Sequence, residues 1–239
     1  MSVLFVPFDG TSKKQISARS CILMYDLFKK QSLLSAKVVN LKGSNPGTFD
    51  QFFQALMGIE QPKVMVGGEH LLTYYSFLYF KSLLSPKKLK LVVFDAHHDA
   101  YTNQHLSHYS FIDWLVHMHE VEVLILGLRH EPEKMNKKVK YVACGENLDE
   151  VKSRIRDFIE ANPFYLSVDV DVIDPTDFKF SAFPVEGGMS LGEFEALFEF
   201  CIALEPKFTD FVEFGIQHQD LCSKMVSRSI QWIERAYSK

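Results

Sequence analysis

The sequence predicts an α/β fold of three layers, α/β/α, in which helices cover both faces of a mostly parallel central sheet of about eight strands. Apolar runs of strand length alternate with stretches of helical periodicity along the 239 residues, which is the pattern of a parallel sheet connected by helices. The apolar runs are continuous, as in strands that are covered on both faces. No repeat or interdomain linker interrupts them, so we expect a single domain over residues 1–239.

Eight segments rich in Val, Ile, Leu, Phe and Tyr are expected to form the strands. In chain order they are residues 3–7, 36–41, 63–66, 89–94, 121–127, 141–144, 164–168 and 209–214. Seven segments between or after them carry apolar residues at helical spacing and are expected to form helices. These are residues 18–30, 49–59, 71–84, 110–119, 148–161, 191–204 and 221–236. Asn147 and Ser190 each precede a helical segment with acidic residues in its first turn, so both are expected to cap a helix.

The composition argues against several classes of function. The formal net charge is −4 and the basic residues are scattered, so we expect no nucleic-acid partner. The first residues lack the features of a signal peptide, and no apolar run is long enough to span a bilayer. We therefore expect no membrane association and a cytoplasmic location. The cysteines form no CxxC pair and are expected to be reduced, mostly buried thiols; they are Cys21, Cys144, Cys201 and Cys222.

Two acidic stretches, residues 95–99 and 169–171, each follow a predicted strand. The residues in them that can bind a metal are Asp95, His97, Asp99, Asp169 and Asp171. Because side chains of an extended segment alternate between its faces, these residues are expected to share one face within each stretch. Both stretches fall at the carboxyl ends of strands, where open parallel sheets place their sites. Four carboxylates so close together would repel one another without cations, so we expect a binuclear metal site.

A third ligand-bearing segment is expected at Gly67-Gly68-Glu69-His70, where the glycines let the backbone come close and His70 opens the next helix. Carboxylates and imidazoles without a thiolate favour manganese, with iron, cobalt, nickel or zinc as alternatives. Two such cations can share a water whose pKa falls towards neutrality, which makes hydroxide available as a nucleophile. A strand-end acid alone is more often a cap or a turn residue. We interpret Asp174 as a turn residue or as an acceptor that bonds a metal-binding residue, and His98 as a packing residue or a partner of the metal-binding residues.

The motifs resemble those of the ureohydrolase family, which includes arginase, agmatinase and formimidoylglutamase. The resemblance covers nearly the whole chain in the family's order, and it is closer to the agmatinase-like members than to arginase proper. The matching segments are residues 6–12 with 18–19, then 67–70, 95–99, 127–129, 167–175 and 187–190, and finally Glu213. The resemblance therefore implies an arginase-like fold for the predicted sheet and helices.

The resemblance also implies two Mn²⁺ ions per chain, or other divalent metals in their place. One ion would be bound by His70, Asp95, Asp99 and Asp169, and the other by His97, Asp95, Asp169 and Asp171. His108 matches the family histidine that handles protons near the site, with a plain surface-loop histidine as the alternative. Glu213 matches the acid that receives the substrate's guanidinium or amidine group, with a plain strand-end carboxylate as the alternative.

The implied reaction is hydrolysis of a C–N bond in a linear guanidine or amidine, with guanidines giving urea and an amine. A metal-bridging hydroxide would attack the planar carbon, and Asp99 or His108 would pass a proton to the leaving amine. The expected partner is therefore a small guanidine or amidine substrate. A homo-oligomer is expected by analogy with the family alone.

Several differences from relatives bear on the substrate rather than on the metal. The loop of residues 100–107 is shorter than in arginase and lacks the asparagine and serine pattern that holds an amino acid's carboxylate. Tyr101 in that loop looks more like agmatinase and is expected to contact the substrate. Residues 180–186 replace a threonine-rich segment, so we expect a more apolar or reshaped pocket and leave the exact substrate open. Glu69 stands where most relatives have aspartate.

Three other functions are alternatives. A single-zinc deacetylase or polyamine amidohydrolase on a related fold also uses an Asp-x-His pair, but it leaves the matches of His70 and Asp99 without a role. Two-metal phosphoesterases need further Asn and His ligands that we cannot place in the sequence. A non-catalytic, metal-binding regulatory module of the same fold would keep the ligands, and the altered segment 180–186 keeps that alternative open.

Overall fold

The computed structural model describes residues 2–11, 16–41, 46–57, 62–84, 88–102, 105–132 and 134–238. The end of the second predicted helix, residues 58 and 59, lies outside the described residues. So do residue 12 of the first motif and residues 103 and 104 of the loop that follows Asp99.

Eight parallel strands form one sheet. They are β1 (Val3–Val6), β2 (Ala36–Val38), β3 (Val64–Gly67), β4 (Lys90–Phe94), β5 (Val123–Leu128), β6 (Val139–Ala143), β7 (Phe164–Asp169) and β8 (Phe208–Val212). Their order across the sheet is β2-β1-β3-β8-β7-β4-β5-β6, and each pair of neighbouring strands runs parallel. The predicted number and direction of the strands are confirmed.

Two strand boundaries differ from the prediction for identifiable reasons. The edge strand β6 begins at Val139 rather than at residue 141 because Lys140, an exposed residue inside the strand, interrupts the apolar run. β8 ends at Val212 rather than at residue 214 because Glu213 has a φ of 61°. That left-handed backbone conformation costs an L-residue about 1–2 kcal/mol and is incompatible with a continuing strand.

The seven predicted helices are all present. They are α1 (Ile16–Gln31), α2 (Pro46–Met57), α3 (Leu71–Leu83), α4 (Phe111–His119), α5 (Leu148–Ile159), α6 (Leu191–Ala203) and α7 (Lys224–Tyr237), with short 3-10 turns η1 (Val170–Val172) and η2 (His218–Asp220). α7 begins three residues later than predicted because the side chain of Ser223 caps it, accepting a hydrogen bond from the Met225 amide at 3.3 Å.

Both predicted helix caps are confirmed. The side chain of Asn147 accepts hydrogen bonds from the amides of Asp149 and Glu150 at 3.0 and 3.3 Å. Ser190 and Glu193 form a reciprocal capping box at the start of α6. Caps of this kind stabilise a helix by about 1 kcal/mol each, because they satisfy amides that have no partner within the helix.

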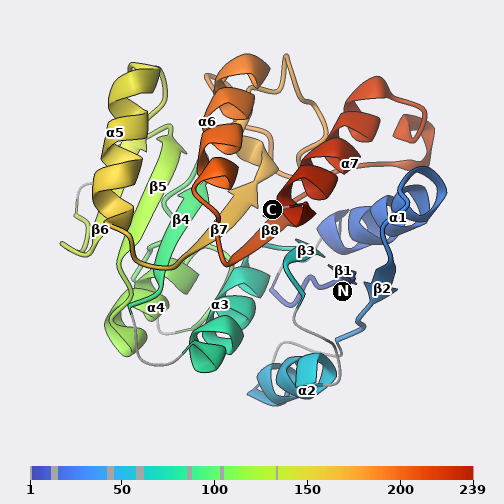
Figure 1. The fold of residues 1–239 in the computed structure, drawn as a ribbon, viewed down its shortest axis with the longest axis horizontal. Helices are drawn as coiled ribbons and strands as arrows, with labels where there is room; N and C mark the ends of the chain where they lie inside the picture. The colour runs from blue at the N-terminus through green and yellow to red at the C-terminus, as the bar shows by residue number, and fades with distance from the viewer. Residues whose placement is uncertain are drawn as a thin grey trace.

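The sheet is the middle of three layers. Helices α1, α5, α6 and α7 cover one face, and α2, α3 and α4 cover the other (Figure 1). Val92 and Val93 are neighbours in β4 and both are fully buried, Val92 in the first of these two cores and Val93 in the second. Burial on both faces explains why the strand segments read as continuous apolar runs.

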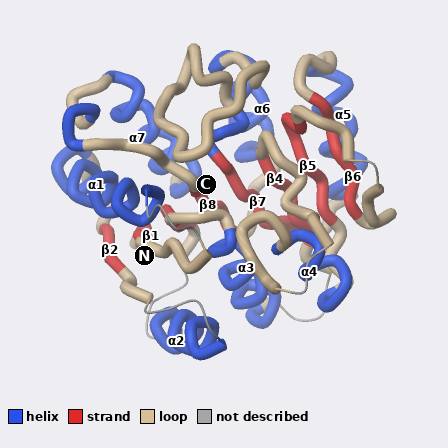
Figure 2. The backbone as a smooth tube through the Cα atoms, turned by 180° about the vertical axis from the view of Figure 1, so that it is seen from behind, coloured by secondary structure: helices blue, strands red, loops and turns tan. Residues whose placement is uncertain are grey.

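The middle of the sheet brings four strands, β3, β8, β7 and β4, side by side. Phe211 of β8 pairs with Val66 of β3 and with Val168 of β7, and Val168 pairs in turn with Phe94 of β4. The four strands therefore end at nearly the same level, and the segments that follow them meet at one edge. The long connection that leaves β7 for α6 runs as a loop (Figure 2).

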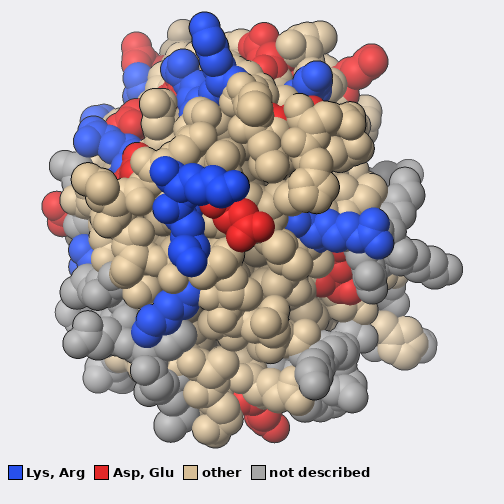
Figure 3. Space-filling model, turned by 90° about the vertical axis from the view of Figure 1, so that its right-hand side faces the viewer, with Lys and Arg blue, Asp and Glu red and all other residues tan. Residues whose placement is uncertain are grey.

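Two further sequence predictions concern the thiols and the surface. Cys21 and Cys201 are buried, but Cys144 is half-buried and Cys222 is exposed, so the expectation of mostly buried thiols holds for only two of the four. No helix in the described part of the chain is both long and apolar enough to cross a membrane. Basic and acidic side chains both appear on the face beside α1 and α7 (Figure 3).

Candidate metal centre

The residues predicted to bind metal leave the sheet on turns rather than on extended strands. β4 ends at Phe94, and residues 95–99 bend until Asp99 reaches a φ of 42°. Asp169 is the last residue of β7, whereas Asp171 belongs to the turn η1. The expectation that strand alternation aligns these side chains is therefore wrong, because the turns bring them together instead.

Hydrogen bonds from backbone amides to the carboxylates hold these turns. The amide of His97 donates to Oδ1 of Asp95 at 2.6 Å, and the amide of Asp171 donates to Oδ1 of Asp169 at 2.8 Å. The amide of Ala96 donates to Oδ1 of Asp171 at 2.9 Å. This last bond ties the segment after β4 to the segment after β7, so the two acidic stretches form one unit.

Arg129 and Asp174 fix the loop around η1. The Arg129 guanidinium donates through Nη2 to the carbonyl oxygens of Asp171 and Val172 at 2.9 and 2.7 Å. Asp174 accepts a hydrogen bond from the amide of Thr176 at 2.9 Å, as expected of a turn residue, and also from the amides of Gly187 and Gly188 at 2.8 and 3.0 Å. These bonds hold the backbone of η1, and thereby Asp171, in place.

The segment after β3 supplies the third predicted ligand. A side chain at Gly68 would place its Cβ 2.0 Å from the carbonyl oxygen of Phe8, so only glycine permits this approach, as predicted. The amide of Glu69 donates to that same carbonyl at 2.8 Å, and the amide of Glu213 donates to the carbonyl of Gly68 at 2.9 Å. His70 is thus fixed at the start of α3, with its side chain buried.

His70 is the nitrogen donor of the first group of ligands. Its Nδ1 lies 3.1 Å from Oδ2 of Asp95 and 3.2 Å from Oδ2 of Asp99. Oδ2 of Asp169 lies 3.3 Å from the same nitrogen. The first group therefore contains the four residues expected for one metal ion.

His97 is the nitrogen donor of a second group. Its Nδ1 lies 2.8 Å from Oδ2 of Asp171 and 3.5 Å from Oδ1 of Asp95. Asp95 therefore presents a different oxygen to each histidine. The imidazole of His97 is 46% exposed, whereas that of His70 is 1% exposed, so the two groups differ in their access to solvent.

These donors fit divalent cations. Nδ1 of His70 and Oδ2 of Asp95 are buried and face each other, and neither has a hydrogen-bond partner among the described residues. Two ligands at right angles around an ion, with bonds of about 2.1 Å, lie about 3 Å apart, which is close to the separations around His70. Burial raises the pKa of Asp169 well above its ordinary value, and the charge of Asp171 raises it further. Bound cations would remove this electrostatic cost.

A buried polar chain lies behind His70. Nε2 of His70 lies 3.1 Å from the hydroxyl of Ser167, which donates to Oδ1 of Asp210 at 2.6 Å. Oδ2 of Asp210 accepts from the hydroxyls of Thr73 and Tyr165 at 2.9 and 2.5 Å. Asp210 is not among the residues predicted for the site, although an acid inside the apolar strand Phe208–Val212 indicates a functional or structural partner, because a buried charge needs partners.

A cavity of about 160 Å³ opens onto both groups of ligands. Besides the ligands, the residues that line it are Tyr101, His108, Tyr109, Phe183 and Glu213. The rings of Phe183 and His108 lie nearly parallel, at 10° with centroids 6.2 Å apart. Tyr101 is 56% exposed and packs on His98 with ring centroids 4.2 Å apart. Tyr101, Tyr109 and Phe183 therefore form an aromatic wall of the cavity, and carboxylates and imidazoles form the rest of its lining.

His108 is held by a residue that the sequence analysis did not single out. The hydroxyl of Thr11 lies 2.8 Å from Nδ1 of His108 and donates to Oε1 of Glu69 at 3.0 Å. Burial lowers the pKa of His108, and the neighbouring His70 lowers it further. His108 is therefore a partly buried residue of the cavity rather than a histidine of an open surface loop.

Glu213 lies in the cavity with its carboxylate held from two sides. Oε2 accepts from the hydroxyl of Ser17 at 2.6 Å, and Oε1 accepts from the amide of His70 at 2.9 Å. Burial raises the pKa of Glu213 to about 8, and a cationic group bound beside it would favour the ionised carboxylate. Its left-handed backbone turns the chain at the end of β8, and so the acid lies between the segments that carry His70 and Asp169.

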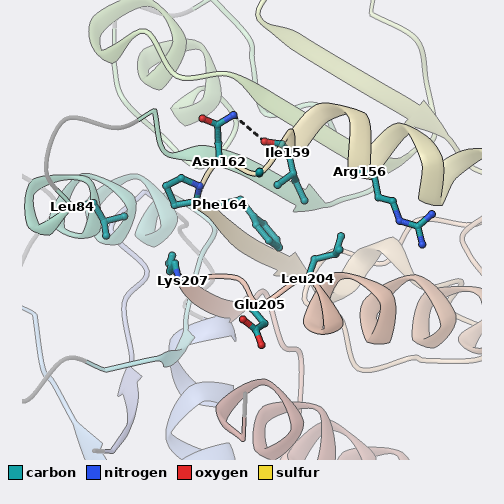
Figure 4. Close-up of a pocket in the computed structure, with 10 residues that line it drawn as sticks. Leu84, Arg156, Ile159, Asn162, Phe164, Leu204, Glu205 and Lys207 are labelled. Atoms are coloured by element: carbon teal, nitrogen blue, oxygen red, sulfur yellow. Dashed lines mark hydrogen bonds between the residues drawn. The ribbon is translucent and has the colours of Figure 1, made fainter.

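A larger cavity, of about 640 Å³, lies at the opposite, amino-terminal edge of the sheet (Figure 4). It is lined by side chains at the ends of α5 and α6 and the starts of β7 and β8, among them Arg156, Phe164, Leu204 and Lys207. None of the carboxylate and imidazole groups described above lies there. Chemistry rather than size therefore identifies the candidate site.

Comparisons with known proteins identify the family and the fold of the chain. A model of the arginase family matches residues 26–220. A curated protein, an uncharacterised 32.2 kDa protein of Methanothermus fervidus, is 25% identical over 121 residues. That match spans 47% of this chain and 41% of the other protein, so the chain covers less than half of this relative's length.

Several solved structures share the fold. Proclavaminate amidino hydrolase of Streptomyces clavuligerus superposes with a TM-score of 0.78 at 19% identity, covering 99% of this chain and 91% of its own. Arginase of Bacillus subtilis gives 0.78 at 17% identity, covering 100% and 98%. Agmatine ureohydrolase of Thermoplasma volcanium gives 0.76 at 19% identity, covering 99% and 88%. At such identities these structures establish the fold alone.

Proposed function

We propose, from the premise that this chain belongs to the arginase family, that it is a hydrolase with two manganese ions that cleaves a C–N bond of a linear guanidine or amidine. One observation carries the proposal. Two groups of metal-type donors, one with His70 and one with His97, share Asp95, which offers a separate oxygen to each. A bridging carboxylate of this kind is what a two-ion site needs.

The cations, when bound, would lower the pKa of a water molecule and so supply a nucleophile at neutral pH. The first would be held by His70, Asp95, Asp99 and Asp169, and the second by His97, Asp95, Asp169 and Asp171. Oxygen donors with one imidazole for each ion favour manganese over softer metals. The remaining residues of the cavity would bind and orient the substrate.

Glu213 is proposed to receive the cationic end of the substrate. Guanidinium and amidinium groups are planar and donate through two parallel N–H groups, which suits a carboxylate. The bonds from Ser17 and from the His70 amide hold this carboxylate in a fixed position. A reacting carbon bound there would lie between His70, which follows β3, and Asp169, which ends β7.

His108 and Asp99 are proposed to move protons. His108 lines the cavity, and its Nδ1 is already bonded to Thr11, so Nε2 is the nitrogen that can exchange a proton with the leaving amine. Asp99 lines the cavity as well. The aromatic residues Tyr101, Tyr109 and Phe183 would contact the part of the substrate that does not react.

The names of the structural relatives support the choice of substrate class. The names proclavaminate amidino hydrolase and agmatine ureohydrolase both refer to hydrolysis of an amidino or guanidino group. The single-zinc alternative leaves one of the two donor groups without a role. The cytoplasmic location stays a prediction from the sequence, and the homo-oligomer stays an expectation by analogy with the family.

The test is an assay of the metal-stripped chain after reloading with Mn²⁺. A panel of linear guanidines and amidines would be followed by release of urea, ammonia or formamide. Asp171→Asn should abolish turnover, because it removes a ligand, whereas Asp157→Asn changes the same functional group on the exposed face of α5 and should not. Turnover of no member of a broad panel, with two ions bound, would instead support a binding or regulatory module.

A further inference from the structure

The buried chain behind His70 has a definite hydrogen-bond direction. His70, Ser167 and Asp210 are each at most 1% exposed. A carboxylate only accepts hydrogen bonds, so the hydroxyls of Ser167, Thr73 and Tyr165, at 2.6, 2.9 and 2.5 Å, all donate to Asp210. Ser167 has a single hydroxyl hydrogen, and that hydrogen is directed to Asp210.

The direction at Ser167 decides which nitrogen of His70 carries a proton. Because Ser167 has no hydrogen left to give, its oxygen accepts from Nε2–H of His70, 3.1 Å away. The lone pair of the neutral imidazole is then on Nδ1. That is the nitrogen that faces the carboxylates of Asp95, Asp99 and Asp169.

We propose that Asp210 is a positioning residue that acts through Ser167 to hold His70 in the tautomer and ring orientation that bind a cation. The proposal rests on the proposed two-metal site. It also explains why an acid is fully buried in the middle of β8. Burial of a charge costs free energy unless hydrogen-bond partners offset it. Groups that bond the far nitrogen of a metal-binding histidine commonly fix its orientation and raise its basicity.

The proposed role concerns only one of the two ions. His70 belongs to the first group of donors, whereas the second group is built around His97, which is on a different segment and about half exposed. Asp210 reaches the site through β7, by way of Ser167, and through α3, by way of Thr73. A change at Asp210 should therefore weaken the binding of one ion and leave the binding of the other unchanged.

Asp210→Asn is the sharpest variant because it keeps the shape, removes the charge and replaces one acceptor oxygen with an NH2 donor. An amide nitrogen facing Ser167 donates to it, so the serine hydrogen turns towards Nε2 of His70 and opposes the proton there. We expect the affinity for one of the two Mn²⁺ ions to fall about 10- to 100-fold. The affinity for the other ion should stay unchanged.

Two further variants separate positioning from folding. Tyr165→Phe removes one donor from Asp210 but leaves the bonds of Ser167 intact, so it should lower stability without changing either Mn²⁺ affinity. Ser167→Ala breaks the chain at its centre with little change in volume, and should weaken the same single ion as Asp210→Asn. It replaces Asp210→Asn if that variant does not fold.

The experiment is a titration of the metal-stripped full chain with Mn²⁺, with the free ion followed by electron paramagnetic resonance. A second readout is the Nε2–H proton of His70 in the protein loaded with diamagnetic Zn²⁺, which should exchange slowly in the wild type and rapidly in Ser167→Ala. Two ions bound with wild-type affinity by both variants would overturn the inference alone. A wild-type chain that binds no pair of ions would overturn the proposed function, and the inference with it.

Discussion

The hydroxyl of Thr11 lies 2.8 Å from Nδ1 of His108 and gives its hydrogen to Glu69, 3.0 Å away. Because that hydrogen is engaged, the threonine oxygen accepts from Nδ1–H, and Nε2 carries the lone pair of His108. The buried Glu69 therefore sets the tautomer of His108 in the cavity, because it accepts the hydrogen of the Thr11 hydroxyl and leaves the oxygen of that hydroxyl to accept from His108. This relationship joins the loop after β1 to the loop before α4.

The first prediction concerns this bond. Thr11→Val keeps the shape of the side chain but removes the hydroxyl, so His108 loses the partner that sets its tautomer. We expect kcat to fall about tenfold or more, a part of what general acid–base catalysis contributes, with unchanged Mn²⁺ content. Steady-state kinetics on the best substrate of the panel measure this. Thr11→Ser keeps the hydroxyl and should retain most of the activity; equal rates for the valine and serine variants would refute the role.

The second prediction concerns Glu213. Glu213→Gln keeps an acceptor for Ser17 but removes the charge that pairs with the cationic end of the substrate. A hydrogen bond to a charged group contributes about 1.5–3 kcal/mol, so kcat/KM should fall about 10- to 150-fold. Mn²⁺ binding should not change, because Glu213 is in neither group of donors. A variant that lost its metal while binding substrate normally would show that Glu213 supports the ions instead.

The sequence predicted where the metal-type residues lie in the fold, but not how their side chains are oriented. The apolar strand ends predicted the region of Asp95, Asp169 and His70, because a parallel sheet brings the carboxyl ends of its strands to one edge. Alternation along a strand did not explain their orientation, since the chain turns directly after Phe94. Turns of this kind depend on bonds between distant segments, such as Ala96 to Asp171. Such bonds cannot be predicted from the spacing of residues in the sequence.

The same limit applies to the residues that the sequence analysis did not assign. Thr11 contacts His108 across 97 positions of the chain, and Thr73 contacts Asp210 across 137. No local pattern marks a threonine for either contact. Asp210 could have been identified from the sequence. An acid within an apolar strand is expected to be buried, and a buried acid needs a polar partner.

The third prediction concerns the aromatic wall. Phe183 lies nearly parallel to His108 and lines the cavity, so it should contact an apolar part of the substrate. Phe183→Ser should lower kcat/KM for guanidines with apolar tails about 10- to 200-fold relative to those with polar tails, which corresponds to about 1–3 kcal/mol of transition-state binding. The ratio of kcat/KM for a matched pair of alkyl and hydroxyalkyl guanidines measures this. Phe183→Tyr preserves the ring and is the control; a ratio that did not change in the serine variant would exclude the contact.

The fourth prediction concerns pH and stability. Burial raises the pKa of Asp9 from 3.8 to about 6, against the lowering effect of the bond from the Ala18 amide. Between these two values the folded protein binds more protons than the unfolded chain, so the contribution of Asp9 to the free energy of unfolding falls as the pH rises from 3.8 to about 6. Asp9→Asn should remove this fall.

Urea unfolding of the metal-free protein across that pH range tests the fourth prediction. The variant should gain stability relative to the wild type as the pH rises, and the gain should level off above about pH 6, where Asp9 is ionised in both states. Asp157→Asn, on the exposed face of α5, is the control and should run parallel to the wild type. A difference that stayed flat or fell with pH would contradict the assignment.

The central claim is that Asp95 lies between two metal ions. Anomalous diffraction at the manganese absorption edge, from crystals of the Mn²⁺-loaded chain, tests it most directly because it counts the ions and locates each one. The account predicts two peaks, one beside His70 and Asp99 and one beside His97 and Asp171, with Asp95 contacting both. A single peak at saturating Mn²⁺, or two peaks away from Asp95, would contradict it.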